Sequence, residues 1–241
     1  NSVYGYLPYK HTALTKQLDG YLIYEELSHK ACYDYCIKNY ISYVIICSEN
    51  FMKDGLVDYL EATNLITCIA PSRYGAQIET SKGFARNLLN RNHKLFNPAY
   101  LIITNQTPFT LVIEFIKRYN NQVVVKGDGL HSGKGVKVYD KHMFSFQEVV
   151  DTIYSIIITG EDVVLEEKIC SDKEFSFITF TDGVTCAHTY PIRDFKTLHE
   201  KNIGPNTGSM GCLTERGSLH YVTETHIRQA EMINSNVIAQ I

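Results

Sequence analysis

VVVKGDGLHSGKGVKV, residues 123–138, is the stretch that decides the fold. It begins with three valines, and a second apolar segment starts at Val136. Each of these segments is typical of a β-strand. The residues between them are rich in glycine, which accommodates tight turns. The pattern therefore predicts a β-hairpin with a glycine-rich tip.

The loop of this hairpin favours an anionic ligand. Glycines let backbone N–H groups approach a ligand closely, and they stand at positions 127, 129, 133 and 135. Lys126 and Lys134 add positive charge, so we expect an oligophosphate to bind here. The spacing fits neither a P-loop nor the pattern G-x-G-x-x-G. The alternative is a hairpin whose glycines only form turns.

Composition excludes several other classes of protein. The net charge of −3, with both signs interspersed, offers no broad surface for nucleic acid or an anionic membrane. The sequence lacks an apolar run of about 18 residues and a signal-peptide pattern at its start. Its seven cysteines have no regular spacing, and Cys32 and Cys36 are expected to be buried thiols rather than metal ligands. We therefore expect a cytoplasmic protein.

The first 70 residues alternate between strand and helix patterns, which predicts a small parallel sheet. The expected strands are 2–6, 43–47 and 66–69, and the expected helices are 28–40, capped by Ser28, and 52–63. Ligands of such sheets bind at the carboxyl ends of the strands. Glu49 follows a strand and is a candidate site residue, although an exposed carboxylate after a strand is also common on protein surfaces.

The rest of the chain predicts a lid-like β-α-β-β-α unit followed by further strands. The expected elements are a helix within 70–92, strand 99–103, a helix to residue 118 capped by Thr107, the hairpin, helix 145–158, strand 163–169, strands 174–181 and 184–190 joined at Asp182-Gly183, and helix 224–241.

The glycine-rich hairpin resembles the segment VVKADGLAAGKGV of the phosphoribosylamine–glycine ligase family, the glycinamide ribonucleotide synthetases of purine biosynthesis. These are ATP-grasp enzymes. Further segments resemble the family in the same order: residues 43–60 (VVIGPEAPLVAGLVD in the family), 70–86 (GPSKAAAQLEGSKAFAK), 163–177 (VIEEFLDGEEASF), 193–197 (QDHKR) and 203–212 (GPNTGGMG). The resemblance covers nearly the whole chain.

The resemblance implies an α/β fold in which a small parallel-sheet, Rossmann-like domain precedes the ATP-grasp lid and part of the ATP-grasp core. The implied boundaries are 1–72 for the N-terminal domain, 73–98 for a helical linker, 99–162 for the lid and 163–241 for part of the core.

The resemblance also implies roles for individual residues. Lys126 and Lys134 are the implied catalytic residues. The implied ATP-binding residues are Lys82, Lys126, Gly129, Ser132, Gly133, Lys134, Gly135, Glu166, Glu167 and Glu174, with Glu166 and Glu167 flanking the base and Glu174 holding ribose hydroxyls. The implied substrate-binding residues are Glu49, Asp194, Lys196, Pro205, Asn206, Thr207 and Gly208. Without the resemblance, Lys82 is better explained as a solvated helix residue, and the loop 203–212 could be a simple turn.

By resemblance, the reaction is ATP-dependent ligation of glycine to 5-phosphoribosylamine, through glycyl phosphate, with Mg²⁺ or Mn²⁺ bridging the phosphates. The alternatives are a truncated or non-catalytic nucleotide-binding relative, and another ATP-grasp carboxylate–amine ligase.

Several departures from the family pattern bear on this interpretation. Cys47 and Ser48 replace the Gly-Pro of the family, and Ser209 replaces a glycine. The family's first glycine loop and its metal ligands have no counterparts in residues 1–241, so no metal site is expected within them. We therefore expect this chain to bind adenine nucleotide weakly and not to turn over by itself.

Overall fold

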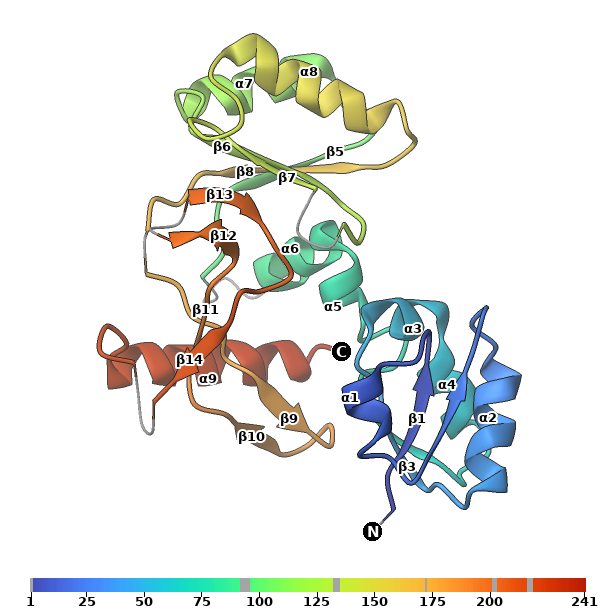
Figure 1. The fold of residues 1–241 in the computed structure, drawn as a ribbon. Helices are drawn as coiled ribbons and strands as arrows, with labels where there is room; N and C mark the ends of the chain where they lie inside the picture. Colours follow the sequence, from blue (N-terminus) through green and yellow to red (C-terminus); the bar gives the residue numbers. More distant parts are fainter. Residues whose placement is uncertain (1, 92–95, 132–134, 172, 201–202, 216–218) are drawn as a thin grey trace. The chain divides into compact units, whose positions relative to one another are not determined.

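The computed structural model describes the chain except residues 1, 92–95, 132–134, 172, 201–202 and 216–218. The chain divides into two compact units, Asn1–Ala76 and Gln77–Ile241 (Figure 1). The finer predicted boundaries within the second unit stay predictions, and each unit is described separately below.

The first unit consists of short strands and helices in alternation. In order they are β1 (Tyr4–Leu7), α1 (Thr12–Thr15), β2 (Gly20–Ile23), α2 (His29–Lys38), β3 (Tyr43–Ile45), α3 (Glu49–Asp54), α4 (Leu56–Glu61) and β4 (Thr67–Ile69). The strands pair in parallel, β1 with β2 and β3 with β4. Parallel pairing was predicted and is confirmed, although the pairing is divided between two ladders and β2 was not expected.

Two local features of the first unit show how sequence sets its helices. Ser28 caps α2 as predicted, because its hydroxyl accepts the N–H of Ala31 at 3.2 Å. The predicted helix 52–63 is wrong, since the structure has two helices that meet at Gly55. The φ of Gly55 is +89°, a left-handed conformation that ends a helix and that glycine adopts at little cost.

The second unit begins with helices α5 (Gln77–Thr80) and α6 (Lys82–Arg91) and contains a four-stranded antiparallel sheet. The elements of the sheet and its helices are β5 (Tyr100–Ile103), α7 (Phe109–Arg118), β6 (Val123–Gly127), β7 (Val136–Val138), α8 (Phe146–Ile157) and β8 (Val163–Glu167). The strand order is β5-β8-β6-β7, with all neighbours antiparallel. β8 therefore lies inside this sheet, between β5 and β6.

The glycine-rich hairpin is confirmed, since β6 and β7 pair with Lys126 opposite Val136. The predicted helix 145–158 is confirmed as α8, and Ser145 is its N-cap. Thr107 does not cap α7, contrary to prediction. Its hydroxyl instead accepts the N–H of Thr104 at 2.9 Å, and Pro108 occupies the cap position of the helix without a side-chain cap bond.

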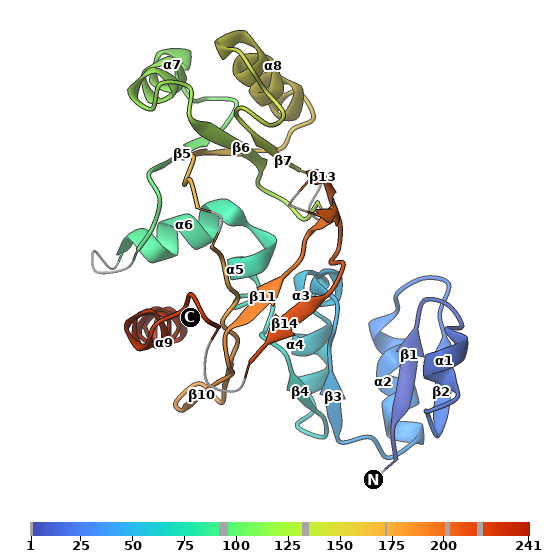
Figure 2. The same ribbon diagram turned by 60° about the vertical axis from the view of Figure 1, so that its left-hand side comes forward.

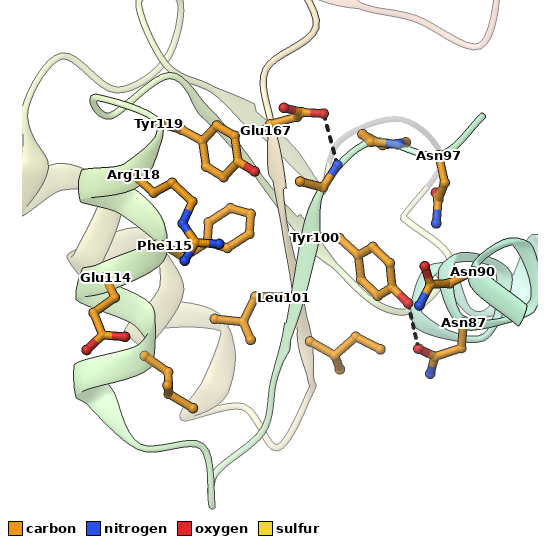
Figure 3. A pocket seen from close by; sticks show the side chains of 14 residues that line it. Asn87, Asn90, Asn97, Tyr100, Leu101, Glu114, Phe115, Arg118, Tyr119 and Glu167 are labelled. Atoms are coloured by element: carbon orange, nitrogen blue, oxygen red, sulfur yellow. Dashed lines mark hydrogen bonds between the residues drawn. The ribbon is translucent and has the colours of Figure 1, made fainter. Parts of the chain in front are cut away.

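The helices lie on both faces of this sheet. Helices α7 and α8 cover one face, and α6 lies on the other (Figures 1 and 2). β5 is an edge strand, and a groove of about 870 Å³ runs along it. α7 contributes Phe115 and Arg118 to this groove, and α6 contributes Asn87 and Asn90 (Figure 3).

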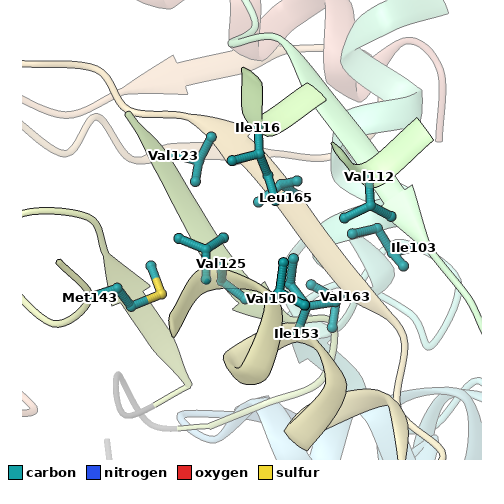
Figure 4. Packing of buried hydrophobic residues seen from close by; sticks show 11 residues of the cluster. Ile103, Val112, Ile116, Val123, Val125, Met143, Val150, Ile153, Val163 and Leu165 are labelled. Carbon is teal, nitrogen blue, oxygen red and sulfur yellow. The ribbon is translucent and has the colours of Figure 1, made fainter. Parts of the chain in front are cut away.

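Side chains alternate along the strands and build the main core on the side of α7 and α8. Val123 and Val125 of β6 point into this core, as do Val163 and Leu165 of β8 (Figure 4). Ile116 of α7 lies in the same core, together with other residues of α7 and α8, and is fully buried. The intervening side chains of these strands face the opposite side of the sheet.

The remainder of the second unit is built from short antiparallel pairs and a long helix. Its elements are β9 (Thr179–Thr181), β10 (Cys186–His188), β11 (Ile192–Asp194), β12 (Thr197–His199), β13 (Ile203–Asn206), β14 (Cys212–Thr214) and α9 (Glu224–Ile238). β9 pairs with β10, β11 with β14, and β12 with β13. The hairpin predicted at Asp182-Gly183 is thus confirmed with shorter strands.

Candidate nucleotide-binding site

The candidate site starts on the sheet face that points away from α7 and α8. We call it the Lys126 face, and it bears Val124 and Lys126 of β6 and Val164 and Glu166 of β8. In the register, Val124 lies opposite Glu166 and Lys126 lies opposite Val164. Lys126 and Glu166 are therefore diagonal neighbours on one face, which is within reach of long side chains.

Glu166 is at the centre of a charged cluster on this face. Its Oε2 lies 2.6 Å from Lys126 Nζ, and Arg86 of α6 approaches both carboxylate oxygens, with Nε 2.7 Å from Oε1 and Nη2 3.1 Å from Oε2. Arg86 also donates from Nη1 to Oδ1 of Asn97 at 3.1 Å. The residue Glu166 is only 4% exposed.

The electrostatics of Glu166 follow from this geometry. Burial raises the pKa of its carboxyl, but the hydrogen bonds and charges of Arg86 and Lys126 outweigh burial and hold that pKa below its ordinary value. The carboxylate is thus ionised at neutral pH. Burial removes its hydration, and the charges of Arg86 and Lys126 compensate for that loss.

Asp128, the first acidic residue of the glycine loop, joins that loop to the start of α6. Its carboxylate accepts the Ser81 hydroxyl at 2.8 Å and the N–H of Gly83 at 2.5 Å. An anion at a helix N-terminus satisfies free N–H groups and interacts well with the helix dipole. A Cβ at Gly83 would lie 3.2 Å from Ile102 Cδ1, so glycine lets α6 approach the sheet closely.

Gly129 is held from both sides. Its N–H donates to Glu161 Oε1 at 2.7 Å, and its carbonyl accepts Lys82 Nζ at 2.6 Å. Burial lowers the pKa of Lys82, while the charges of Asp128 and Glu161 oppose that shift. Lys82 and Lys126 therefore both lie beside the glycine loop.

The glycine loop also accommodates a histidine. A Cβ at Gly127 would lie 2.7 Å from His131 Nε2, and one at Gly135 would lie 2.5 Å from His131 Cγ. These glycines make room for the imidazole ring. Ser132, Gly133 and Lys134, which were predicted to bind the phosphates, lie outside the described residues.

The two adjacent carboxylates of β8 point to opposite faces of the sheet. Glu166 lies on the Lys126 face, whereas Glu167 lines the groove beside α7 and accepts the N–H of Ala99 at 2.9 Å (Figure 3). Strand alternation explains this separation. Only Glu166 is therefore on the same face as Lys126.

The predicted substrate residues of the second unit come together in two groups of contacts. Thr207 donates its N–H and its hydroxyl to the carbonyl of Lys196, at 2.6 and 3.0 Å. Asp194 Oδ1 accepts the hydroxyl of Ser209 at 2.6 Å. Glu174, predicted to hold ribose, is paired with Lys196 through Oε1 and Nζ at 2.8 Å.

The other predicted residues are distributed as follows. Pro205 and Asn206 belong to β13, and with Lys137 and His142 they line a hollow of about 470 Å³. A Cβ at Gly208 would meet nothing within 4 Å. Glu49, the first residue of α3, is exposed in the first unit.

Sequence reasoning missed Arg86, Asn97, Asp128 and Glu161. Asp128 stood within the quoted loop, yet its partners lie 45 and 47 residues away in sequence. No local signal pairs Arg86 with Glu166, which is 80 residues further along.

The described residues were also considered as metal ligands and as membrane-spanning segments, and they offer neither. They contain no group of three or more His, Cys, Asp or Glu side chains placed to hold a metal ion. They also contain no helix that is both long and apolar enough to cross a membrane.

Residues 80–241 match the model of the phosphoribosylglycinamide synthetase ATP-grasp (A) domain, which is more than half of the chain. The chain belongs to this family. Among curated relatives, the phosphoribosylamine–glycine ligase of Methanocorpusculum labreanum is 31% identical over 229 residues, which are 95% of this chain and 51% of that protein. The trifunctional purine biosynthetic protein adenosine-3 of Gallus gallus is 34% identical over 187 residues, 76% of this chain and 18% of that protein.

Solved structures show the same fold. The crystal structure of a phosphoribosylamine–glycine ligase from Thermotoga maritima has a TM-score of 0.72 at 21% identity, covering 99% of this chain and 61% of that one. An N5-carboxyaminoimidazole synthetase from Staphylococcus aureus, solved as a complex with ADP, has a TM-score of 0.69 at 14% identity, covering 100% of this chain and 57% of that one. The chain spans about half the length of the curated family members named phosphoribosylamine–glycine ligase that it matches.

Proposed function

We propose that this chain supplies the nucleotide-binding lid and part of the substrate site of a phosphoribosylamine–glycine ligase. The reaction joins glycine to 5-phosphoribosylamine, with ATP converted to ADP and phosphate. The family match over residues 80–241 is the observation that supports this proposal most strongly. The relatives named for the same ligase reaction agree with it.

The residues of the Lys126 face suit the polyphosphate of ATP. Lys126 and Lys82 supply positive charge on either side of a glycine loop, and we assign Lys134, Ser132 and Gly133 of that loop to the same role. Gly129 and Gly135 keep the loop backbone close to the ligand. ATP would supply the γ-phosphoryl group that activates the carboxylate of glycine, and Mg²⁺ or Mn²⁺ would supply further positive charge at the phosphates; none of the described residues forms a site for that ion.

The work of these residues in this reaction is positioning and neutralisation of charge. Lysine side chains and backbone N–H groups stabilise the charge that builds up on the transferred phosphoryl group, and no protein nucleophile is needed. We assign Lys126 and Lys134 the catalytic roles and Glu174 the ribose contact. We assign Glu166 and Glu167 to the base through their backbone, because the Glu166 carboxylate is paired with Arg86 and Lys126 and the Glu167 side chain lines the groove beside α7.

We place the substrates at the loop that joins β13 to β14. Asp194 and Lys196 are bonded to residues of this loop, and with Pro205, Asn206, Thr207 and Gly208 they offer donors and acceptors for a small amino acid and a sugar phosphate. The substrate-binding role of Glu49, which lies in the first unit, stays a prediction from the resemblance. We propose a cytoplasmic protein whose partners are these small molecules rather than nucleic acid or membranes, because all seven cysteines are free thiols and the net charge is only −3.

The test is release of ADP from MgATP, with glycine and freshly generated phosphoribosylamine added singly and together. ADP release that requires both substrates supports the ligase. ADP release with other carboxylates but not with glycine would assign a different ATP-grasp ligase. Nucleotide binding without ADP release under any of these conditions would fit either part of a ligase or the non-catalytic alternative, and the same assay on a chain of the relatives' full length would separate the two: ADP release there supports the ligase, and its absence assigns the non-catalytic alternative.

A further inference from the structure

Glu166 is shared between two cations, and this arrangement leaves a surplus of positive charge. Arg86 and Lys126 both contact its carboxylate, at 2.7 and 2.6 Å. One anion cannot neutralise two cations, so the cluster is positively charged as a whole. The side chains of Arg86 and Lys126 are 22% and 21% exposed, so the surplus charge is only partly hydrated.

The position of Arg86 decides which cation keeps its charge available. Its guanidinium forms a two-pronged contact with both carboxylate oxygens, which is the most specific geometry for an arginine and a carboxylate. Lys126 contacts a single oxygen, Oε2. Arg86 is therefore the main counter-ion of Glu166, and Lys126 is held in place without being fully neutralised.

Asn97 fixes Arg86 in this orientation. Its Oδ1 accepts from Arg86 Nη1 and its Nδ2 donates to the carbonyl of Arg86, both at 3.1 Å. The guanidinium thus makes three side-chain hydrogen bonds, two to Glu166 and one to Asn97. Such a group is held by its partners rather than free to reach a ligand.

We propose that Arg86 is a positioning residue for nucleotide binding: by neutralising Glu166, it leaves the charge of Lys126 for the phosphates of an adenine nucleotide. This inference rests on the proposed function, since it takes Lys126 as a phosphate-binding residue. Without Arg86, the nearly buried Glu166 carboxylate has, among the described residues, Lys126 as its only charged partner within ion-pair distance. Lys126 would then be neutralised by Glu166 and would attract phosphates weakly.

The experiment measures the dissociation constant of MgADP by isothermal titration calorimetry for the wild type and six variants, the sixth of which is Lys126→Ala. Arg86→Met removes the counter-ion, Arg86→Lys keeps its charge, and Glu166→Gln removes the anion. The double variant Arg86→Met/Glu166→Gln restores a single unpaired cation, Lys126. Arg118→Met removes an exposed arginine of α7, on the other face of the sheet, and serves as the matched control.

We expect Arg86→Met to weaken MgADP binding by roughly tenfold or more, since one nearby positive charge is lost from a partly desolvated site. Arg86→Lys should stay within about threefold of the wild type, and so should Arg118→Met. The double variant should recover most of the affinity for MgADP that Arg86→Met loses, although it lacks the side chains of both Arg86 and Glu166. A residue that served only to support the fold would give no such recovery.

Two results would overturn the inference. One is wild-type affinity in Arg86→Met, and the other is a folded double variant that binds no better than Arg86→Met. Thermal unfolding of each variant shows which of them are folded. Lys126→Ala separates this inference from the proposed function, because undiminished MgADP binding in Lys126→Ala would place the nucleotide elsewhere and overturn both.

Discussion

His131 Nε2 lies 2.6 Å from Glu161 Oε1, the same oxygen that accepts the N–H of Gly129 at 2.7 Å. One carboxylate from the loop before β8 thus holds two points of the glycine loop. Burial raises the pKa of Glu161, but Gly129 and His131, together with the charge of Lys82, hold that pKa below its ordinary value. Glu161 is ionised at neutral pH and is an anchor for the loop.

Replacement of Glu161 by alanine should loosen the glycine loop. The N–H of Gly129 then has no acceptor, and we expect its hydrogen exchange to quicken by about tenfold or more. His131→Ala should have a smaller effect, because the bond from Gly129 to Glu161 remains. Exchange of the Gly129 amide is measured by NMR, with Glu114→Ala on α7 as control. Unchanged exchange in Glu161→Ala would contradict the anchoring role.

The stability of the protein should depend on Glu166 at acid pH. A carboxyl whose pKa is lower in the folded state stabilises that state fully above its ordinary pKa of about 4.3, and this stabilisation is lost as pH falls through the lowered value. The free energy of unfolding in urea is measured at several pH values for the wild type and Glu166→Gln. The wild type should lose more stability than the variant below about pH 5. Other acidic residues titrate in both proteins, so their effects cancel in the comparison. If the free energy of unfolding of the two proteins changed with pH in parallel, Glu166 would not contribute to the acid dependence.

Ser209 occupies a backbone conformation that suits glycine. Its φ is +147°, and the related family segment has glycine there. Ser209→Gly should relieve about 1 kcal/mol of strain, but it loses the hydrogen bond that the Ser209 hydroxyl donates to Asp194 and the one that it accepts from the N–H of Gly211, each worth about 1 kcal/mol, so the variant should be slightly less stable than the wild type. Ser209→Ala keeps the strain and loses both bonds, and should be less stable than Ser209→Gly by about 1 kcal/mol or more. Urea unfolding of both variants measures the difference, and equal stability would contradict the strain.

The thiols should differ in reactivity. Cys32 and Cys36 are buried in α2, as predicted, whereas Cys47, Cys170 and Cys212 are exposed. Burial raises the pKa of Cys68 to about 11, which leaves little reactive thiolate at neutral pH. Titration with a chromogenic disulfide should therefore label the three exposed thiols first. Labelling of Cys32 or Cys36 at the same rate would show that α2 opens readily.

Much of the lid was predictable because its signals are local. The three valines before Lys126 and the glycines of the loop predict the hairpin, and the apolar pattern of residues 145–158 predicts α8; both elements are confirmed. Gly55 was also a local signal for the break between α3 and α4, yet the apolar pattern on either side favoured one helix. The opposite orientations of Glu166 and Glu167 follow from strand alternation and could have been predicted.

The cluster around Glu166 could not be predicted in the same way. Arg86 and Glu166 are 80 residues apart and meet only because α6 packs beside β8. The contacts of Asp128 with Ser81 and Gly83 depend on the same packing. Sequence periodicity indicates which face a residue occupies, but it does not give the strand register or the helix that covers that face.

Adenine nucleotide should bind at the Lys126 face rather than in the groove along β5. Titration of the ¹⁵N-labelled protein with MgADP, followed by amide chemical shifts, tests it most directly. We predict shifts at Lys126, Gly129 and Gly135, and at Lys82 of α6, with little change at Leu111 and Phe115 of α7. Shifts confined to Leu111, Phe115 and the other residues of the β5 groove would show that the nucleotide does not bind at the Lys126 face.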